Sequence, residues 1–289
     1  MEQRIWYHSI EPNKGLARKD PYLFSILTAV LLGVYLYATG KFSDLAYALS
    51  GSIALAYLDE TLFRLIAAGA VVWFVRRYLP GFHFGLSTKG MGRGFSLLTV
   101  IYVMMVLGGQ GRLLLADYSA FSVPSVWQVL LLPFFMLSVG LMEEFVFRGL
   151  ILGLLYEKWG ATRRGITGAA LASGLLFGVE HLINLFSAPQ LRVYTLVQVI
   201  GAGMIGVYFA SVYLRCGSLW PLVAVHAMYD LMLLAPTMFF PNLAEAVATD
   251  IPLWQGALSL VVYSPFLIVG LVQLKKVWRY APTQAVKTA

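Results

Sequence analysis

The sequence predicts an all-α membrane protein, a polytopic bundle of about eight transmembrane helices. Of its 289 residues, 59% are hydrophobic and only 12% are charged, whereas an average soluble domain carries roughly 25% charged residues. The apolar residues come in runs of about 20, the length that a helix needs to cross a hydrocarbon layer of about 30 Å. A spanning helix also satisfies its own backbone polar groups. We therefore expect one integral membrane domain over residues 1–289.

Eight apolar segments are the candidate spans. In chain order they cover residues 22–39, 53–75, 95–111, 125–156, 166–184, 193–214, 217–237 and 253–274. The first segment is too long for the apolar region of a signal peptide and lacks a small-residue cleavage site. The second is interrupted by Asp59, Glu60 and Arg64. The connections are short and rich in Gly, Pro and Ser, so we expect no soluble appendage.

The Lys and Arg residues are distributed unevenly between the predicted connections. With both termini in the cytoplasm, only Lys41, Arg112 and Arg192 of the 21 Lys and Arg residues lie outside, Arg64 and Arg148 lie within spans, and the other sixteen lie inside. This bias follows the positive-inside rule. We therefore predict that both termini are cytoplasmic. The compact form of the sequence is typical of a prokaryotic protein, so we expect a prokaryotic cytoplasmic membrane. The net charge of +7 then belongs to the membrane surface, so the expected partner is the lipid bilayer and not nucleic acid.

Charged side chains are costly inside a membrane and are functional candidates by default. The strongest group is LMEEFVFRGL in the fourth segment. Glu144 and Arg148 are spaced i, i+4 and can pair on one helix face. Glu143 points about 100° away from Glu144 on a helix and is left free for chemistry. The alternative is a structural ion pair with an accidental extra glutamate.

Two later segments carry further titratable residues. His181 ends the sequence FGVEH in the fifth segment, and His226 and Asp230 are spaced i, i+4 in the seventh. At 1.5 Å of rise per residue, Glu143, His181 and Asp230 lie roughly 20 Å from the cytoplasmic ends of their segments, with His226 one turn shallower. Each histidine alone is more typical of a hydrogen-bonded core residue. A common depth on three helices favours a single site.

The sequences EEFVFR, FGVEH and HAMYD resemble the EExxxR, FxxxH and HxxxN motifs of the CPBP family. This is the CAAX-protease and bacteriocin-processing family, which includes the type II CAAX prenyl endopeptidases (the Rce1-like proteases). The resemblance covers residues 125–237, which would form the catalytic core. It implies a glutamate-dependent intramembrane endopeptidase whose substrate is a protein or peptide, prenylated or otherwise membrane-anchored. Glu144 and Arg148 would be a supporting pair.

The resemblance also implies catalytic roles by position. Glu143, as general base, and His181 would hold and activate a water. His226 and the residue at position 230 would stabilise the oxyanion of the tetrahedral intermediate. The family usually has Asn at this last position, and this chain has Asp230. An ionised aspartate cannot donate a hydrogen bond, so either Asp230 is protonated, or it orients His226 as an imidazolium donor, or the activity is altered. Of these three we expect the orienting role.

Other functions remain open from the sequence. No cofactor is expected for the glutamate mechanism, but a zinc-dependent protease could use Glu143, His181 and His226 as ligands, although the HExxH motif is absent. A non-catalytic scaffold or immunity protein on the same fold is a second alternative. A transporter also uses buried acids, but no clear inverted repeat is present. DETLFR at 59–64 is interpreted as a structural ion-pair set, with a substrate channel as the alternative.

Overall fold

The computed structural model describes residues 15–278. Within that range the helices are α1 (Leu16–Lys19), α2 (Pro21–Ser50), α3 (Ile53–Tyr78), α4 (Met91–Leu97), α5 (Thr99–Leu114), η1 (Tyr118–Ala120), α6 (Val126–Glu144), η2 (Phe145–Leu152), α7 (Gly153–Trp159), α8 (Arg163–Glu180), η3 (His181–Ile183), α9 (Asn184–Ser187), α10 (Arg192–Cys216), α11 (Trp220–Phe239), α12 (Pro241–Val247) and α13 (Leu253–Trp278). The predicted cytoplasmic location of the two chain ends falls on residues outside this range.

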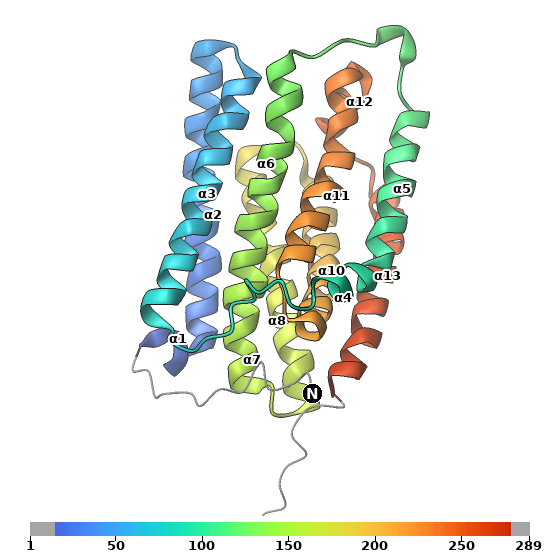
Figure 1. Ribbon diagram of the computed structural model, residues 1–289. Helices are drawn as coiled ribbons and strands as arrows, with labels where there is room; N and C mark the ends of the chain where they lie inside the picture. Colours follow the sequence, from blue (N-terminus) through green and yellow to red (C-terminus); the bar gives the residue numbers. More distant parts are fainter. Residues whose placement is uncertain (1–14, 279–289) are drawn as a thin grey trace, which may run out of the picture.

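The long helices run side by side in a bundle (Figure 1). Among the described residues, six helices are long and apolar enough to cross a membrane, and the bent pair α4–α5 makes up to seven. The described part of the chain is therefore all-helical, and the protein is an integral membrane protein. α3 is also 26 residues long, but it contains Asp59, Glu60 and Arg64. The count of eight spans and their orientation stay predictions.

The first predicted segment ends too early. The helix does not stop at Thr39 but continues to Ser50, where Gly51 adopts a positive φ of 65°. Residues 40–50 continue the helix because they include apolar side chains and no proline. The left-handed backbone at Gly51 suits a residue without a Cβ, and it ends the helix.

The predicted span over 95–111 is not one straight helix, because α4 and α5 meet at Leu98 with a bend of 56°. The Tyr208 hydroxyl, which comes from α10, donates to the Leu97 carbonyl at 2.7 Å and accepts from the Val100 N–H at 3.3 Å. A side chain from a distant part of the sequence thus supplies hydrogen bonds at the break in the helical ladder.

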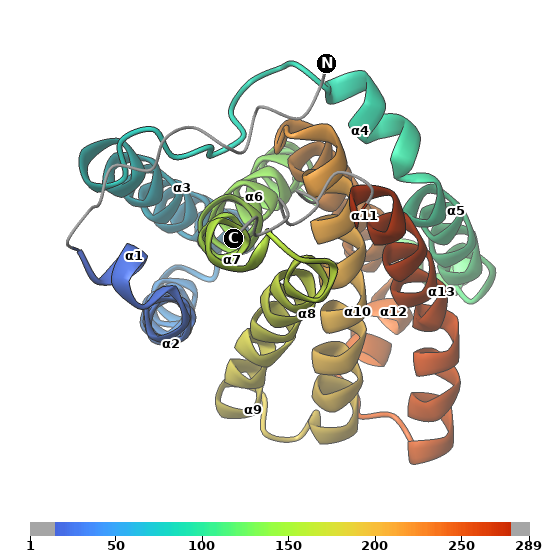
Figure 2. The same ribbon diagram turned by 90° about the horizontal axis from the view of Figure 1, so that it is seen from below.

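Four helices form the middle of the bundle. Seen from below (Figure 2), α2 and α3 lie at one edge and α5 and α13 at the opposite edge, with α6, α8, α10 and α11 between them. A Cβ on Gly140 would lie 2.8 Å from the Val223 carbonyl oxygen, and one on Gly178 would lie 2.3 Å from that of Val199. Glycine therefore allows the backbone of α6 to approach α11, and that of α8 to approach α10, at the level of the site.

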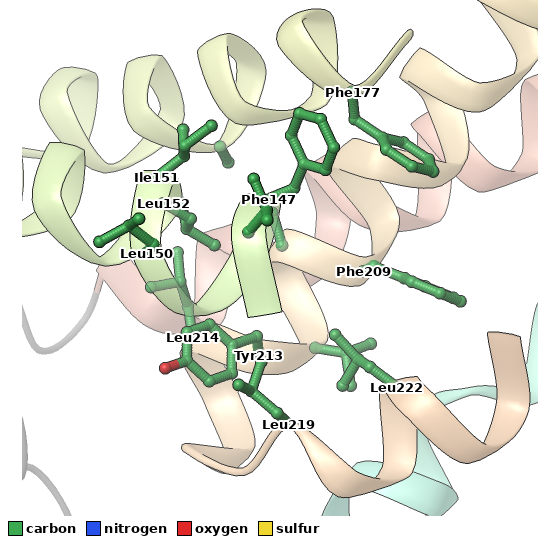
Figure 3. Packing of buried hydrophobic residues seen from close by; sticks show 14 of the residues in the cluster. Phe147, Leu150, Ile151, Leu152, Phe177, Phe209, Tyr213, Leu214, Leu219 and Leu222 are labelled. Carbon is green, nitrogen blue, oxygen red and sulfur yellow. The ribbon is translucent and has the colours of Figure 1, made fainter. Parts of the chain in front are cut away.

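The lower part of the bundle, around η2 and α7, is densely packed. η2 is a π-helix, and all of its eight residues are buried. Figure 3 shows Phe147 of this segment among buried side chains that include Phe177 of α8 and Phe209 of α10. π-Helical segments occur frequently at functional sites, and this one begins directly after Glu144.

Candidate active site

A cavity of about 670 Å³ lies above this packed region, among α3, α6, α8, α10 and α11. The acidic, basic and histidine side chains along its wall are Glu60, Arg64, Arg112, Glu143, Glu180, His181, His226 and Asp230. Much of the remaining wall is apolar, with side chains such as Leu36, Ile101 and Leu233. The cavity therefore brings titratable groups together within an apolar surround.

Glu143 lies near the end of α6, with its carboxylate at the cavity and 8% of the residue exposed. Its Oε2 lies 3.4 Å from Nε2 of His226. Glu143, Glu180 and His181 each have one potential ligand atom within 4.8 Å of those of the other two. The structure thus brings residues of α6, η3 and α11 together around one carboxylate.

Glu144 is directed away from the cavity and is fully buried. Its Oε1 accepts hydrogen bonds from Nη1 of Arg148 at 3.1 Å and from Nδ1 of His226 at 2.7 Å. Arg148 is fully buried too, and its guanidinium carbon lies 4.3 Å from the Phe177 ring centroid and 5.3 Å from that of Phe209. Aromatic faces attract a cation, so the arginine has one carboxylate and two rings as its partners.

His226 is held on both sides of its ring. Because a carboxylate only accepts, the 2.7 Å contact places a hydrogen on Nδ1, which donates to Glu144. Nε2 then faces the cavity, at 3.4 Å from Glu143 Oε2 and 3.4 Å from Asp230 Oδ2. The bond that fixes the ring at Nδ1 therefore comes from Glu144, which the sequence did not indicate. Asp230 lies at the other nitrogen.

His181 comes directly after the end of α8, where η3 begins. Its Nδ1 lies 2.9 Å from the carbonyl oxygen of Phe177, one turn earlier. A carbonyl oxygen accepts only, so Nδ1 carries the hydrogen, and in the neutral ring Nε2 is the acceptor. His181 lines the cavity, and its second ring nitrogen can accept a hydrogen bond or bind a metal.

Four charged cavity residues are not among the predicted site residues, namely Glu60, Arg64, Arg112 and Glu180. Glu180 is 9% exposed and lies beside His181. Glu60 and Arg64 form an ion pair on α3, and the guanidinium carbon of Arg64 lies 4.9 Å from the ring centroid of Phe135. The segment interpreted as a structural ion pair therefore lines the cavity. Two features of the sequence could have indicated three of these residues. Glu180 is an acid directly before His181, and DETLFR at 59–64 is similar to EEFVFR.

Comparison with known proteins gives one family match, to part of the chain. No curated protein sequence matches the chain. Residues 125–232 match the family model described as type II CAAX prenyl endopeptidase Rce1-like. The matched segment includes Glu143, His181, His226 and Asp230, all of which line the cavity. Over this segment, the chain is similar to the Rce1-like CAAX proteases.

Proposed function

We propose that the chain is a glutamate-type intramembrane endopeptidase, in which Glu143 and His181 activate a water molecule. The observation that carries the proposal is the arrangement of Glu143, His181 and His226 around one cavity, while Glu144 is bonded in the core. A carboxylate and a neutral imidazole can each accept a hydrogen bond from one of the two O–H groups of the same water molecule. The water oxygen then has a lone pair directed at a substrate carbonyl.

In the first step, Glu143 takes a proton from the water as its oxygen attacks the carbonyl carbon. The carbonyl oxygen becomes an oxyanion, which needs a donor in a site of low dielectric. Nε2 of His226 faces the cavity and, in an imidazolium, would donate to it. Glu144 would favour that imidazolium through Nδ1. The Glu143 proton then passes to the leaving nitrogen as the C–N bond breaks.

The substrate that we propose is a membrane-associated or lipid-modified protein. The apolar side chains of the cavity wall support this, as does the family description, which names prenyl endopeptidases. The excess of basic residues at one side of the predicted topology supports a cytoplasmic membrane with those ends inside. A prokaryotic source remains part of the proposal.

The test is cleavage of a farnesylated CAAX-type peptide, with and without its lipid, by the purified chain in liposomes. Glu143→Gln and His181→Ala should abolish cleavage while leaving the protein inserted and folded. Glu245→Gln is the matched control, because Glu245 is exposed and does not line the cavity. Full cleavage by Glu143→Gln would rule out the general-base assignment. A folded wild-type protein that cleaves neither peptide would favour a scaffold role or another substrate.

A zinc-dependent peptidase is the second candidate, because Glu143, Glu180 and His181 lie close enough to hold one ion. This set includes Glu180, where the sequence suggested His226. Two carboxylates and one imidazole fit the oxygen and nitrogen ligands that zinc accepts. A zinc ion there would lower the pKa of a bound water. Stoichiometric zinc in the purified protein, with reversible inactivation by EDTA, would replace the metal-free mechanism, whereas full activity after chelation and metal removal would reject zinc.

A further inference from the structure

Arg64 lies in the middle of α3 and lines the same cavity as the proposed base. Its Nη1 pairs with the carboxylate of Glu60, one turn earlier, and also donates a hydrogen bond to the Glu60 carbonyl oxygen at 3.3 Å. Its Nε is buried and has no hydrogen-bond partner within residues 15–278. A guanidinium carries five N–H donors, so the contacts of Nη1 leave other donors of Arg64 for a second anion.

The packing of α3 against α6 places Arg64 at the level of Glu143. The two helices lie side by side and both run downward in Figure 1. The rings of Tyr57 and Phe135 stack between them, with centroids 5.5 Å apart. Arg64 is seven residues after Tyr57, and Glu143 is eight residues after Phe135. With 1.5 Å of rise per residue, Arg64 and Glu143 therefore lie within about 2 Å of one level along the bundle.

Arg64 supplies positive charge to two acids of the site. It interacts electrostatically with Glu143 and with Glu180. One oxygen of each of these carboxylates lies within 4.8 Å of the other, so the two repel each other strongly in a cavity of low dielectric. A cation beside both carboxylates offsets that repulsion. Arg64 is held for this role by Glu60 and by the ring of Phe135, whose centroid lies 4.9 Å from the guanidinium carbon.

The other arginines of this region are placed differently. Arg148 also interacts with Glu143, but it is fully buried and bonded to Glu144. Arg112 lines the cavity from the last turn of α5 and interacts with Tyr263. Of the two arginines in the cavity wall, Arg64 is therefore the one that lies at the acids.

A divalent metal ion would compete with Arg64 for the same carboxylates. Glu143 and Glu180 are two of the three residues that lie close enough to hold an ion, and a guanidinium beside them repels a cation that enters. An arginine and a metal ion are thus alternative ways to balance the charge of these acids.

We propose that Arg64 is a positioning residue that acts through Glu143 and Glu180 as their internal counter-cation, and that it thereby keeps a divalent metal ion out of the site. The inference deepens the proposed peptidase function and rests on it for the role of Glu143. It implies that the base acts without a metal because its cation is built into α3.

The experiment measures zinc binding, which does not depend on cleavage. The full-length protein in nanodiscs is freed of metal with EDTA, the chelator is removed, and zinc is titrated by isothermal calorimetry. Arg64→Gln should bind one zinc ion roughly tenfold more tightly than the wild type, because the repelling charge is gone. Arg64→Lys keeps the charge and should resemble the wild type. Arg112→Gln is the matched control, because it removes the same charge from another part of the cavity wall.

A double variant separates the role of Arg64 from the loss of its ion pair. Arg64→Gln alone leaves Glu60 without its partner, which can destabilise the protein or turn Glu60 into a metal ligand. Glu60→Gln with Arg64→Gln leaves no unpaired carboxylate at position 60, and it should show the same gain in zinc affinity. Adding Glu180→Gln should remove the gain, because the ion then loses one of its acids.

Four results would overturn the proposal. They are a wild-type protein that binds zinc as tightly as Arg64→Gln, a gain that is absent from the double variant, a gain that survives Glu180→Gln, and an equal gain in Arg112→Gln. Cleavage of the farnesylated peptide is then measured in EDTA. Arg64→Gln should cut about tenfold more slowly than the wild type, and Arg64→Lys should keep most of the rate.

Cleavage and zinc binding together distinguish the two ways of failing. If the wild type cuts no peptide although zinc affinity rises in the Arg64 variants, the peptidase chemistry fails and the counter-cation role of Arg64 stands. If the wild type cuts the peptide and Arg64→Gln changes neither zinc affinity nor cleavage rate, the role of Arg64 fails and the peptidase chemistry stands.

Discussion

Replacement of Glu144 by alanine should remove stability and activity for two separable reasons. Glu144 and Arg148 are both fully buried, and the only side-chain hydrogen bond of Arg148 in the described part of the chain goes to Glu144. Glu144→Ala would leave a guanidinium in the core without its anion. Removing one partner of a buried ion pair costs about 3–5 kcal/mol, and the aromatic faces of Phe177 and Phe209 replace only part of that.

The double variant Glu144→Ala, Arg148→Met separates stability from activity. Methionine removes the stranded charge and keeps an unbranched chain that can pack between the two rings. Replacing both members of a buried ion pair with apolar groups is often neutral, so most of the lost stability should return. Activity should not return, because Nδ1 of His226 still lacks its carboxylate, and loss of such a supporting bond typically lowers activity by about 10–100-fold.

Both quantities can be measured on the same preparations. The free energy of unfolding is obtained from denaturant titration in mixed micelles, and activity from peptide cleavage in liposomes. Glu245→Ala, an exposed position, serves as the control. The reasoning is refuted if the double variant is no more stable than Glu144→Ala, or if it recovers the wild-type cleavage rate.

Three further outcomes are expected. Asp230→Asn should keep or raise the cleavage rate, because an amide can donate to the oxyanion; a loss of activity with unchanged folding would contradict that. Gly178→Ala should lower the yield of folded protein by size-exclusion chromatography, because the new Cβ would lie 2.3 Å from the Val199 carbonyl oxygen, and overpacking costs about 1–3 kcal/mol; a wild-type yield would argue against this close approach. The N–H of Tyr194 donates a hydrogen bond to the Asp250 carboxylate, and together with neighbouring backbone N–H groups it holds the pKa of that carboxyl below its usual value. The ionised carboxylate therefore stabilises the fold fully at neutral pH, and this stabilisation is lost only as the pH falls through the lowered pKa. Asp250→Asn should therefore lower the Tm at pH 7, and the Tm values of variant and wild type should converge in acid. A difference in Tm that stays the same at every pH would contradict this role of the Asp250 carboxylate.

Local spacing within one helix was enough to predict some contacts. The Glu144–Arg148 pair and the approach of His226 to Asp230 both follow from residues four apart, because a helix places such residues on one face. The membrane-spanning character follows from composition and run length. These inferences need no knowledge of how the helices pack.

Contacts between distant residues could not be read from the same patterns. The Glu144–His226 hydrogen bond joins two helices whose separation depends on Gly140. An estimate of depth in the membrane gives the level of a residue but does not say which neighbouring helix its side chain faces. The bend at Leu98 depends on Tyr208, more than a hundred residues later. Arg64 shares the cavity because α3 packs against α6, which no pattern within α3 indicates.

The boundary between the packed half and the hollow half of the bundle passes between Glu143 and Glu144. On one side, residues 145–156 are all buried. On the other side, part of the wall comes from α2, α3 and α5, which expose many of their apolar side chains. The proposed base, Glu143, thus lies between a closely packed segment and outer helices that are packed less closely. Substitutions of apolar residues in those outer helices can change which substrates are accepted while the reacting groups stay in place, so that the choice of substrate can evolve separately from the chemistry.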